Sequence, residues 1–139
     1  MGLILDTSLL IADERGRFDM TGFLRQHLGS RPIIAAITAS ELLHGVERAQ
    51  DAGRKARRQQ HVEQILAAVF VLSFDLAQAR VHARIWAELA SRGEIIGTHD
   101  LQIAAAGLAL GHEVATLNVH EFRRINGLTV VDATSFRIA

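Results

Sequence analysis

Residues 3–10 have the sequence LILDTSLL, in which a short apolar run passes into an acid and two hydroxyl residues. The run predicts a buried strand at 3–5, and a helix is predicted at Thr7–Glu14, with Gly16 as its end. Asp6 then lies at the carboxyl end of the first strand. Open α/β sheets bind their ligands outside the carboxyl ends of the strands, so this segment indicates both a fold and a place for a site.

Short apolar runs and helical patterns alternate along the rest of the chain. We expect further strands at 33–37, 70–73, 113–117 and 128–131, and further helices at 20–28, 38–50, 54–68, 76–91, 101–110 and 119–125. This alternation favours an α/β fold in three layers, with a mostly parallel central sheet of about four to five short strands between helices. No linker or repeat divides the 139 residues, so we predict one domain at 1–139.

Composition narrows the possible functions. The 15 basic and 15 acidic residues give a formal net charge of zero, so any contact with nucleic acid has to be local or to involve metal ions. The absence of cysteine excludes disulfides and thiolate metal sites and is compatible with a reducing cytoplasm. No signal-peptide layout or membrane-length apolar run is visible, so we expect a soluble, cytoplasmic protein without a membrane partner.

Three carboxylates stand near the carboxyl ends of expected strands. Asp6 ends the first strand, Glu41 lies in the first turn of the helix after the second, and Asp100 lies at another helix start. Converging acids repel one another, by about 3 kcal/mol for two unit charges about 5 Å apart at an effective dielectric of about 20. Mg²⁺ or Mn²⁺ would relieve this repulsion, because hard cations prefer oxygen ligands, and would also activate water and phosphoryl groups.

Each carboxylate also has a purely structural interpretation. Asp6 suits the N-cap of the helix that follows it. Thr38 and Glu41 fit a capping box, in which both side chains serve the helix end. Asp100 is favoured in a first helical turn by the helix dipole. Spacing alone leaves both interpretations open.

Four segments, taken in order, resemble the PIN-domain ribonucleases, and specifically the VapC-type toxins of bacterial toxin–antitoxin pairs. They are LDTS at 5–8, TASELLHGV at 38–46, IGTHDLQIAA at 96–105, and TLNVHEF at 116–122 followed by NGL at 126–128. The resemblance covers nearly the whole chain. It implies a PIN-like fold, Mg²⁺- or Mn²⁺-dependent endoribonuclease activity on cellular RNA, a cognate VapB-type antitoxin that blocks the site, and a homodimer.

The resemblance also assigns roles to residues. It makes Asp6 and Asp100 metal ligands, Glu41 a ligand or the group that orients water, and Thr116 a hydrogen-bonding support for the acids. We expect water to attack a backbone phosphorus in line, which leaves 5′-phosphate and 3′-hydroxyl ends. These residues do not specify which RNA is cut or at which sequence.

One position departs from the family pattern. Asn118 stands where many relatives have a fourth acid, which puts a second tightly held metal in doubt. Glu121, one helical turn further on, is either its replacement or an ordinary surface charge. A catalytically weak or inactive PIN-fold module that binds RNA or protein is therefore the alternative function. A phosphorelay receiver domain is a weaker alternative, because Asp6 has no acidic neighbour and Lys55, the one lysine, lies in an expected helix.

An acidic site repels RNA, so it needs cations around it. Candidate phosphate contacts are Arg54 and Lys55, in the densest basic run at 54–58, and Arg15 and Arg17, near the first acidic junction. A solvated helix end is the structural alternative for the run. His99 and His120 flank the expected site and are candidate substrate contacts or solvated side chains.

Two apolar groups and one aromatic residue are expected in the core. The groups are Leu42, Leu43 and Val46, and Phe18, Met20, Phe23 and Leu24; the aromatic residue is Trp86. If partly exposed, the two groups would instead offer a groove for an antitoxin helix or a dimer contact.

Overall fold

The first strand, β1 (Gly2–Leu5), is buried along its whole length because it lies in the middle of a five-stranded sheet. The computed structural model describes residues 2–138, and its strand order is β3-β2-β1-β4-β5, with every neighbouring pair parallel. The other strands are β2 (Arg31–Ala35), β3 (Phe70–Leu72), β4 (Glu113–Thr116) and β5 (Val130–Asp132). The predicted α/β fold with a mostly parallel sheet is therefore confirmed.

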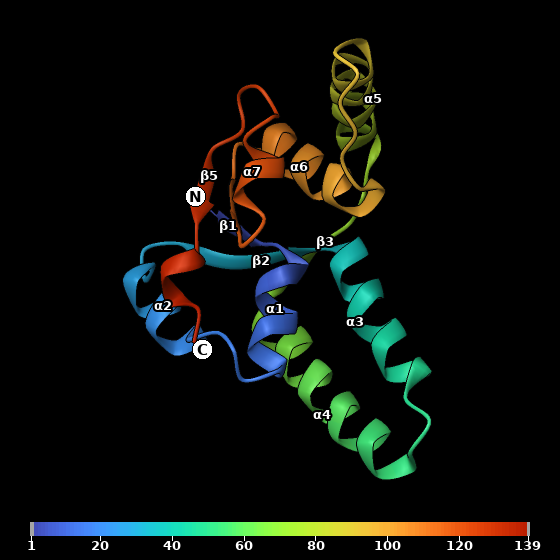
Figure 1. The fold of residues 1–139 in the computed structure, drawn as a ribbon, viewed down its shortest axis with the longest axis vertical. Helices are drawn as coiled ribbons and strands as arrows, with labels where there is room; N and C mark the ends of the chain where they lie inside the picture. The colour runs from blue at the N-terminus through green and yellow to red at the C-terminus, as the bar shows by residue number, and fades with distance from the viewer. Residues whose placement is uncertain (1, 139) are drawn as a thin grey trace.

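Helices cover both faces of this sheet, which gives the expected three layers (Figure 1). In the described part of the chain they are α1 (Thr7–Glu14), α2 (Met20–Gln26), α3 (Ala36–Arg48), α4 (Ala52–Ala68), α5 (Leu76–Ser91), α6 (Thr98–Leu110) and α7 (Val119–Phe122), followed by a 3₁₀ turn, η1 (Thr134–Phe136). Helices α1 to α4 lie below the sheet in Figure 1 and α5 to α7 above it. None of the described helices is long and apolar enough to cross a bilayer.

Alternate side chains of the strands pack into two separate hydrophobic cores, one on each face of the sheet. Ile4, with its neighbours on β2 and β4, packs under α5, α6 and α7, while Leu3 and Leu5 pack against α1, α2 and α4. This follows from the strand geometry, because successive side chains point to opposite faces of a sheet. Fully burying one such aliphatic side chain stabilises the fold by about 1.5–3 kcal/mol.

Helices α3, α4 and α6 begin two or three residues before their predicted starts at 38, 54 and 101. Helix α3 begins at Ala36, so Ala35 occupies its N-cap and Thr38 lies within the first turn. The capping-box interpretation of Thr38 and Glu41 is therefore wrong, since a capping threonine would have to stand just before the helix. Asp6 does occupy the N-cap of α1, but its side chain makes no capping hydrogen bond.

Two expected core residues point outward. Trp86 is 61% exposed, and Leu43 is 39% exposed. Each follows a buried neighbour, Ile85 or Leu42, by one residue, and one residue is a rotation of about 100° around a helix. Placing Trp86 in the core was wrong for this reason.

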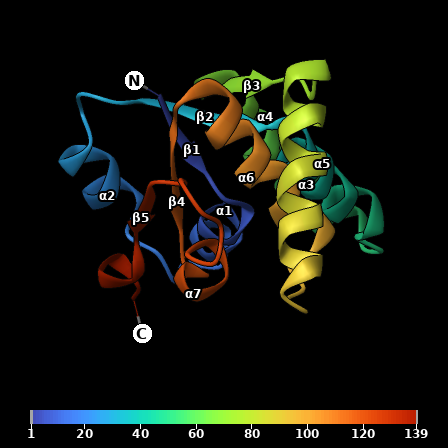
Figure 2. The ribbon, with the colours of Figure 1, turned by 90° about the horizontal axis from the view of Figure 1, so that it is seen from above.

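The connections between strands locate the crevice of the sheet. From β1 the chain passes through β2 to β3 on one side, and then crosses to β4 and β5 on the other side (Figures 1 and 2). The strand order thus reverses at β1, and in doubly wound folds ligands bind at the carboxyl ends of the strands at such a reversal. Asp6 and Thr116 stand at this place.

Candidate active site

Asp6 has a buried carboxylate that accepts hydrogen bonds from side chains on only one of its two oxygens. The residue is 1% exposed, and its Oδ2 accepts hydrogen bonds from Ser8 Oγ and Thr116 Oγ1, each at 2.7 Å. Its Oδ1 is buried and has no hydrogen-bond partner among residues 2–138. Burial raises the pKa of this carboxyl group. The side-chain hydrogen bonds from Ser8 and Thr116, and the backbone N–H groups of Thr7 and Ser8, only partly oppose that effect. An ionised Asp6 therefore lacks a counter-charge at Oδ1.

Asp100 connects Asp6 to two further acids. It lies in the first turn of α6, and its pKa is raised to about 7, first by burial and then by the charge of Asp6. A hydrogen bond and the charge of Glu121, and the charge of Glu41, raise the pKa further. Four carboxylates, one just after β1 and one each on α3, α6 and α7, therefore share one electrostatic environment.

Glu41 is held between hydroxyl groups and a histidine. Thr7 Oγ1 donates to Glu41 Oε1 at 2.8 Å and lies 3.0 Å from Thr38 Oγ1. On the other side, His99 Nδ1 lies 3.3 Å from Glu41 Oε2, which makes an ion pair when the imidazole is protonated. Helix α3 thus presents Glu41 in a fixed orientation toward α1 and α6.

The loop after β4 orients the two hydroxyls that bind Asp6. Leu117 N donates to Ser8 Oγ at 3.2 Å, and Asn118 N donates to Thr116 Oγ1 at 2.8 Å. Because each hydroxyl accepts from a backbone N–H, its own proton is free for Asp6. Asn118 enters this network through its backbone, and its side chain makes no hydrogen bond to another side chain within the described range.

The acidic cluster, which we define as Asp6, Glu41, Asp100 and Glu121, has the donor set for a hard divalent cation. Among residues 2–138, no three acidic or histidine side chains already surround a common point as the ligands of a bound ion would. However, Asp6 Oδ1 is an unpaired acceptor, and Asp100 is repelled by the three other acids. A cation between these oxygens would remove both penalties, so the residues fit Mg²⁺ or Mn²⁺.

Sequence reasoning did not identify the hydroxyl groups around the acids, apart from Thr116. Ser8 and Thr7 directly follow Asp6 in the chain, so their place at the same strand end was the available signal. The sequence suggested only a helix-capping role for Thr38. Its hydrogen bond with Thr7 joins residues of two different helices, so it could not be predicted from local sequence.

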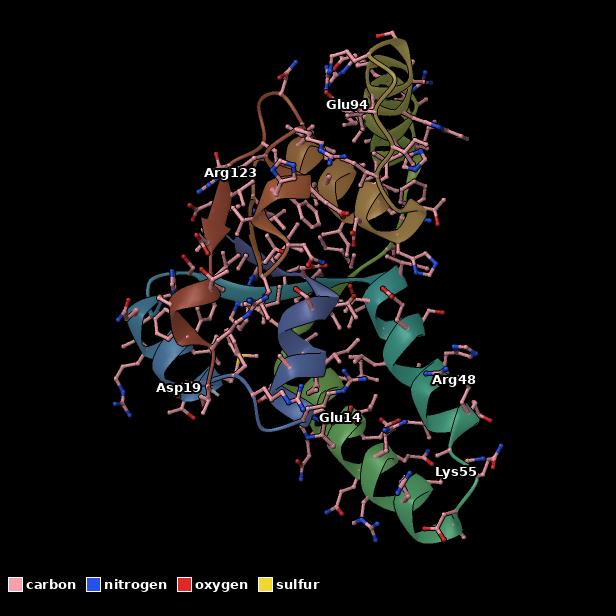
Figure 3. The ribbon with its side chains drawn as sticks, viewed as in Figure 1. Glu14, Asp19, Arg48, Lys55, Glu94 and Arg123 are labelled. Carbon is pink, nitrogen blue, oxygen red and sulfur yellow. The ribbon has the colours of Figure 1, made fainter. Side chains whose placement is uncertain are left out.

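The two sets of basic residues are placed differently. In the run at 54–58, Lys55 Nζ lies 3.8 Å from Glu47 Oε2, and Arg58 Nε lies 2.9 Å from Glu14 Oε1. Figure 3 shows Lys55 near the far end of the α3–α4 pair, away from the sheet. Arg15 and Arg17, by contrast, line a surface hollow that also contains Ser8, whose hydroxyl donates to Asp6.

Comparisons with known proteins identify the family. Residues 3–128 match the PIN domain model. Ribonuclease VapC1 of Rickettsia felis is 36% identical over 135 residues, which cover 97% of this chain and 98% of that protein. The tRNA(fMet)-specific endonuclease VapC of Shigella flexneri is 30% identical over 136 residues, which cover 93% and 96%.

A solved structure agrees with these relatives. The crystal structure of DNA-bound VapBC from Salmonella typhimurium contains a chain that superimposes with a TM-score of 0.84 at 28% identity, covering 95% of this chain and 98% of that one. The resemblance seen in the sequence is thereby confirmed. This chain belongs to the PIN-domain family, and within it to the VapC ribonuclease toxins of VapBC toxin–antitoxin systems.

Proposed function

We propose that this ribonuclease is a divalent-metal-dependent endoribonuclease with Asp6, Glu41 and Asp100 as its catalytic residues. The observation that carries the proposal is the buried, unpartnered Oδ1 of Asp6 beside Asp100, whose pKa is raised to about 7. A fold does not retain repelling carboxylates at its sheet crevice for stability, because removing buried like charges stabilises a protein. The arrangement is accounted for if a cation binds there in function.

Each residue has a distinct role in this proposal. Asp6 and Asp100 would hold Mg²⁺ or Mn²⁺, and Glu41 would hold it directly or through water. When bound, the ion supplies charge stabilisation at a phosphoryl oxygen and lowers the pKa of water. Thr116 donates its hydroxyl proton to Asp6 Oδ2, which orients the carboxylate and leaves the lone pairs of Oδ1 available for the ion. Glu121 extends the cluster toward α7, whereas Asn118 contributes no charge.

The chain's own groups define the reaction geometry. Thr7 fixes Glu41 Oε1 and His99 faces Oε2, so Glu41 is positioned to orient the attacking water and to accept its proton. Attack by water on the phosphorus of an RNA backbone leaves the 2′-hydroxyl unused. The products are a 5′-phosphate and a 3′-hydroxyl end.

The decisive experiment compares the wild type with Asp6→Asn and Asp100→Asn. Purified proteins are incubated with total RNA and with Mg²⁺, Mn²⁺ or a chelator, and the new ends are mapped chemically; growth arrest on expression is scored in parallel. Initiator tRNA is the first defined substrate to include, because relatives such as the Shigella protein are named for cleaving it. Cleavage that survives the chelator, or that either variant retains in full, contradicts the metal mechanism.

An inactive PIN-fold binding module remains the second candidate, favoured by the neutral Asn118 where a fourth acid is expected. A thermal unfolding series with Mn²⁺ separates the two. A ligand at 100 times its Kd stabilises the folded state by about 2.7 kcal/mol, whereas a site that has lost its metal shows no Mn²⁺-dependent stabilisation.

The antitoxin partner follows from the relatives, several of which were solved as toxin–antitoxin complexes. We assign its docking helix to a largely apolar hollow of about 240 Å³ between α1, α2 and α4, lined by Leu10, Met20, Leu24 and Ile65. Apolar grooves of this kind accept the apolar face of an amphipathic helix. Met20→Glu is expected to weaken the complex without affecting cleavage by the free toxin.

A cytoplasmic homodimer is the assembly we expect for the free toxin. Exposed Phe70, Phe74 and Trp86 at β3 and α5 are the candidate contact, with His82 edge-on to both Phe74 and Trp86. Sedimentation of the wild type and of Trp86→Arg measures this directly; a wild type that is monomeric at micromolar concentration contradicts it.

A further inference from the structure

We infer that Arg137, with Arg15 and Arg17, forms a phosphate-binding hollow that holds the RNA backbone beside the acidic cluster. The inference rests on the proposed ribonuclease function and adds a residue that no motif indicated. The hollow, of about 500 Å³, is lined by these three arginines together with Ser8, Leu117 and Ile138. We call it the arginine hollow.

Backbone pairing places Arg137 in the arginine hollow. Ile138 N donates to Arg17 O at 2.9 Å, and Asp19 N donates to Phe136 O at 2.8 Å. Between these two hydrogen bonds, Phe18 and Arg137 form an isolated antiparallel bridge. The end of the described chain is thereby fixed against the segment that follows α1, so arginines distant in the sequence share one surface.

The arginine hollow adjoins the acidic cluster directly. Ser8 lines it, and the hydroxyl of Ser8 donates to Asp6 Oδ2 at 2.7 Å. Leu117, which also lines it, donates its N–H to the same hydroxyl. Ser8 is thus common to the hollow and to the hydrogen bonds of Asp6, and we infer that the hollow takes a phosphate near the one that is cut.

The three arginines have donors available for an anion. Within residues 2–138, none of them has a carboxylate oxygen within 4.0 Å, whereas Arg58 is paired with Glu14. Arg137 acts on Asp132 only weakly, because the lowered pKa of Asp132 is due first to hydrogen bonds with Thr134 and only then to the charges of Arg123 and Arg137. Guanidinium groups bind phosphate oxygens in a bidentate manner, and these side chains are exposed.

Local positive charge is needed at this place. The chain has no net charge, and the acidic cluster repels a phosphate backbone, so the chain as a whole does not attract RNA. An acidic peptide would also suit the arginines, but it has no use for the neighbouring carboxylates. Substrate RNA is therefore the occupant that accounts for both features together.

The test measures RNA binding apart from cleavage. Full-length wild type, Arg17→Gln, Arg137→Gln and the triple variant with Arg15→Gln are titrated against a fluorescent single-stranded RNA in chelator, over a series of salt concentrations. Each lost phosphate contact reduces the salt dependence of log K by about 0.7 for single strands, so the triple variant is expected to lose about 2 and to bind at least about tenfold more weakly. Arg80→Gln, an exposed arginine on α5, is the matched control and is expected to behave as the wild type.

The outcomes are distinct for the two proposals. An unchanged salt slope in the triple variant, with normal thermal unfolding, overturns the arginine hollow, as does a loss of antitoxin affinity without a loss of RNA affinity. A reduced slope supports it even if the wild type cuts no RNA, a result that would contradict only the nuclease mechanism. A wild type that binds no RNA in chelator overturns the arginine hollow, whereas the nuclease mechanism is tested only by cleavage in the presence of metal.

Discussion

Strands β1 and β4 run side by side, and their two ends are built differently. At the amino end, Gly2 N donates to His112 Nδ1 at 3.1 Å, and Gly111 uses a φ of 70° to turn α6 into β4. Burial lowers the pKa of His112, which favours the neutral imidazole that this hydrogen bond requires. At the carboxyl end the same strands stop at Asp6 and Thr116, where one buried carboxylate oxygen has no partner.

The difference separates stability from function within one sheet. The polar groups at the amino end are paired, and the packing there is tight, so changes at this end should act on folding. At the carboxyl end the carboxylates of the acidic cluster repel one another, so substitutions there should act on metal binding and cleavage. Some of these substitutions should even stabilise the metal-free protein. The predictions below test this division in order of expected effect.

The largest effect is expected for Asp6→Asn. In the proposed mechanism Asp6 is a metal ligand, and its loss would remove several kcal/mol of transition-state stabilisation. Each 1.4 kcal/mol is about a factor of ten in rate, so cleavage should fall at least about a hundredfold. The same substitution removes a buried charge without changing the shape of the side chain, so at pH 8 the metal-free variant should unfold at a higher temperature than the wild type. Loss of activity accompanied by a lower unfolding temperature would show that Asp6 is mainly structural.

Metal binding and pH should act together on stability. The pKa of Asp100 is raised from 3.8 in the unfolded chain to about 7 in the folded protein, first by burial and then by the neighbouring acids. Between these values the folded state binds the proton more tightly, so the free energy of unfolding of the metal-free protein falls as the pH rises from 3.8 to about 7 and levels off above that.

If Asp100 binds metal as proposed, Mn²⁺ competes with that proton and reverses the trend. At saturating Mn²⁺ the gain in stability should be about 2.7 kcal/mol at 100 times the Kd at pH 8, and smaller at pH 5.5. Calorimetry of the wild type and of Asp100→Asn at both pH values measures this. Asp100→Asn should show a weaker pH slope and little Mn²⁺ effect; equal Mn²⁺ stabilisation in the two proteins would place the ion elsewhere.

Thr116→Val tests the support of Asp6. The substitution keeps the shape of a fully buried side chain but removes the donor to Asp6 Oδ2 and the acceptor of Asn118 N. Leaving such groups unpaired costs about 1–3 kcal/mol, and a poorly oriented Asp6 should lower cleavage by about tenfold. Thr116→Ser retains the hydroxyl and should recover most of the rate, measured with a defined RNA substrate; a Ser variant as slow as the Val variant would count against the hydrogen bond.

The parts of this molecule that sequence reasoning could predict are those set by short-range patterns. The apolar run before Asp6 predicted β1 and the strand end, and the segments around Glu41 and Asp100 predicted their helices. Trp86 was misplaced because a helical pattern defines a face only to within about one residue, which is a rotation of about 100°. The capping box failed because β2 ends at Ala35 and α3 begins at Ala36, two residues before the predicted helix start.

Features that depend on long-range contacts could not be predicted. The sequence offered Glu121 as either a replacement acid or a surface charge, and its place beside Asp100 follows only from the packing of α7 against α6. Arg137 gains its place beside Arg17 through a backbone bridge that side-chain patterns do not specify. Ser8 was visible next to Asp6, but its second bond, from Leu117 N, required the β1–β4 pairing.

The smallest effect is expected at the amino end, for Gly107→Ala in α6. A Cβ there would lie 3.0 Å from both Leu128 Cδ1 and Val114 Cγ2, and 3.2 Å from the carbonyl oxygen of His112. Overpacking costs about 1–3 kcal/mol, while alanine in place of glycine returns up to about 1 kcal/mol of helix propensity, so a net loss of about 1 kcal/mol is expected. Gly45→Ala in α3 is the matched control, because its Cβ would meet only Arg58 at 3.8 Å, and it should be neutral or stabilising. Denaturant unfolding gives both values, and cleavage per folded molecule should be unchanged in each; a Gly107→Ala enzyme that folds normally but cuts RNA more slowly would mean that the two ends of the sheet are coupled.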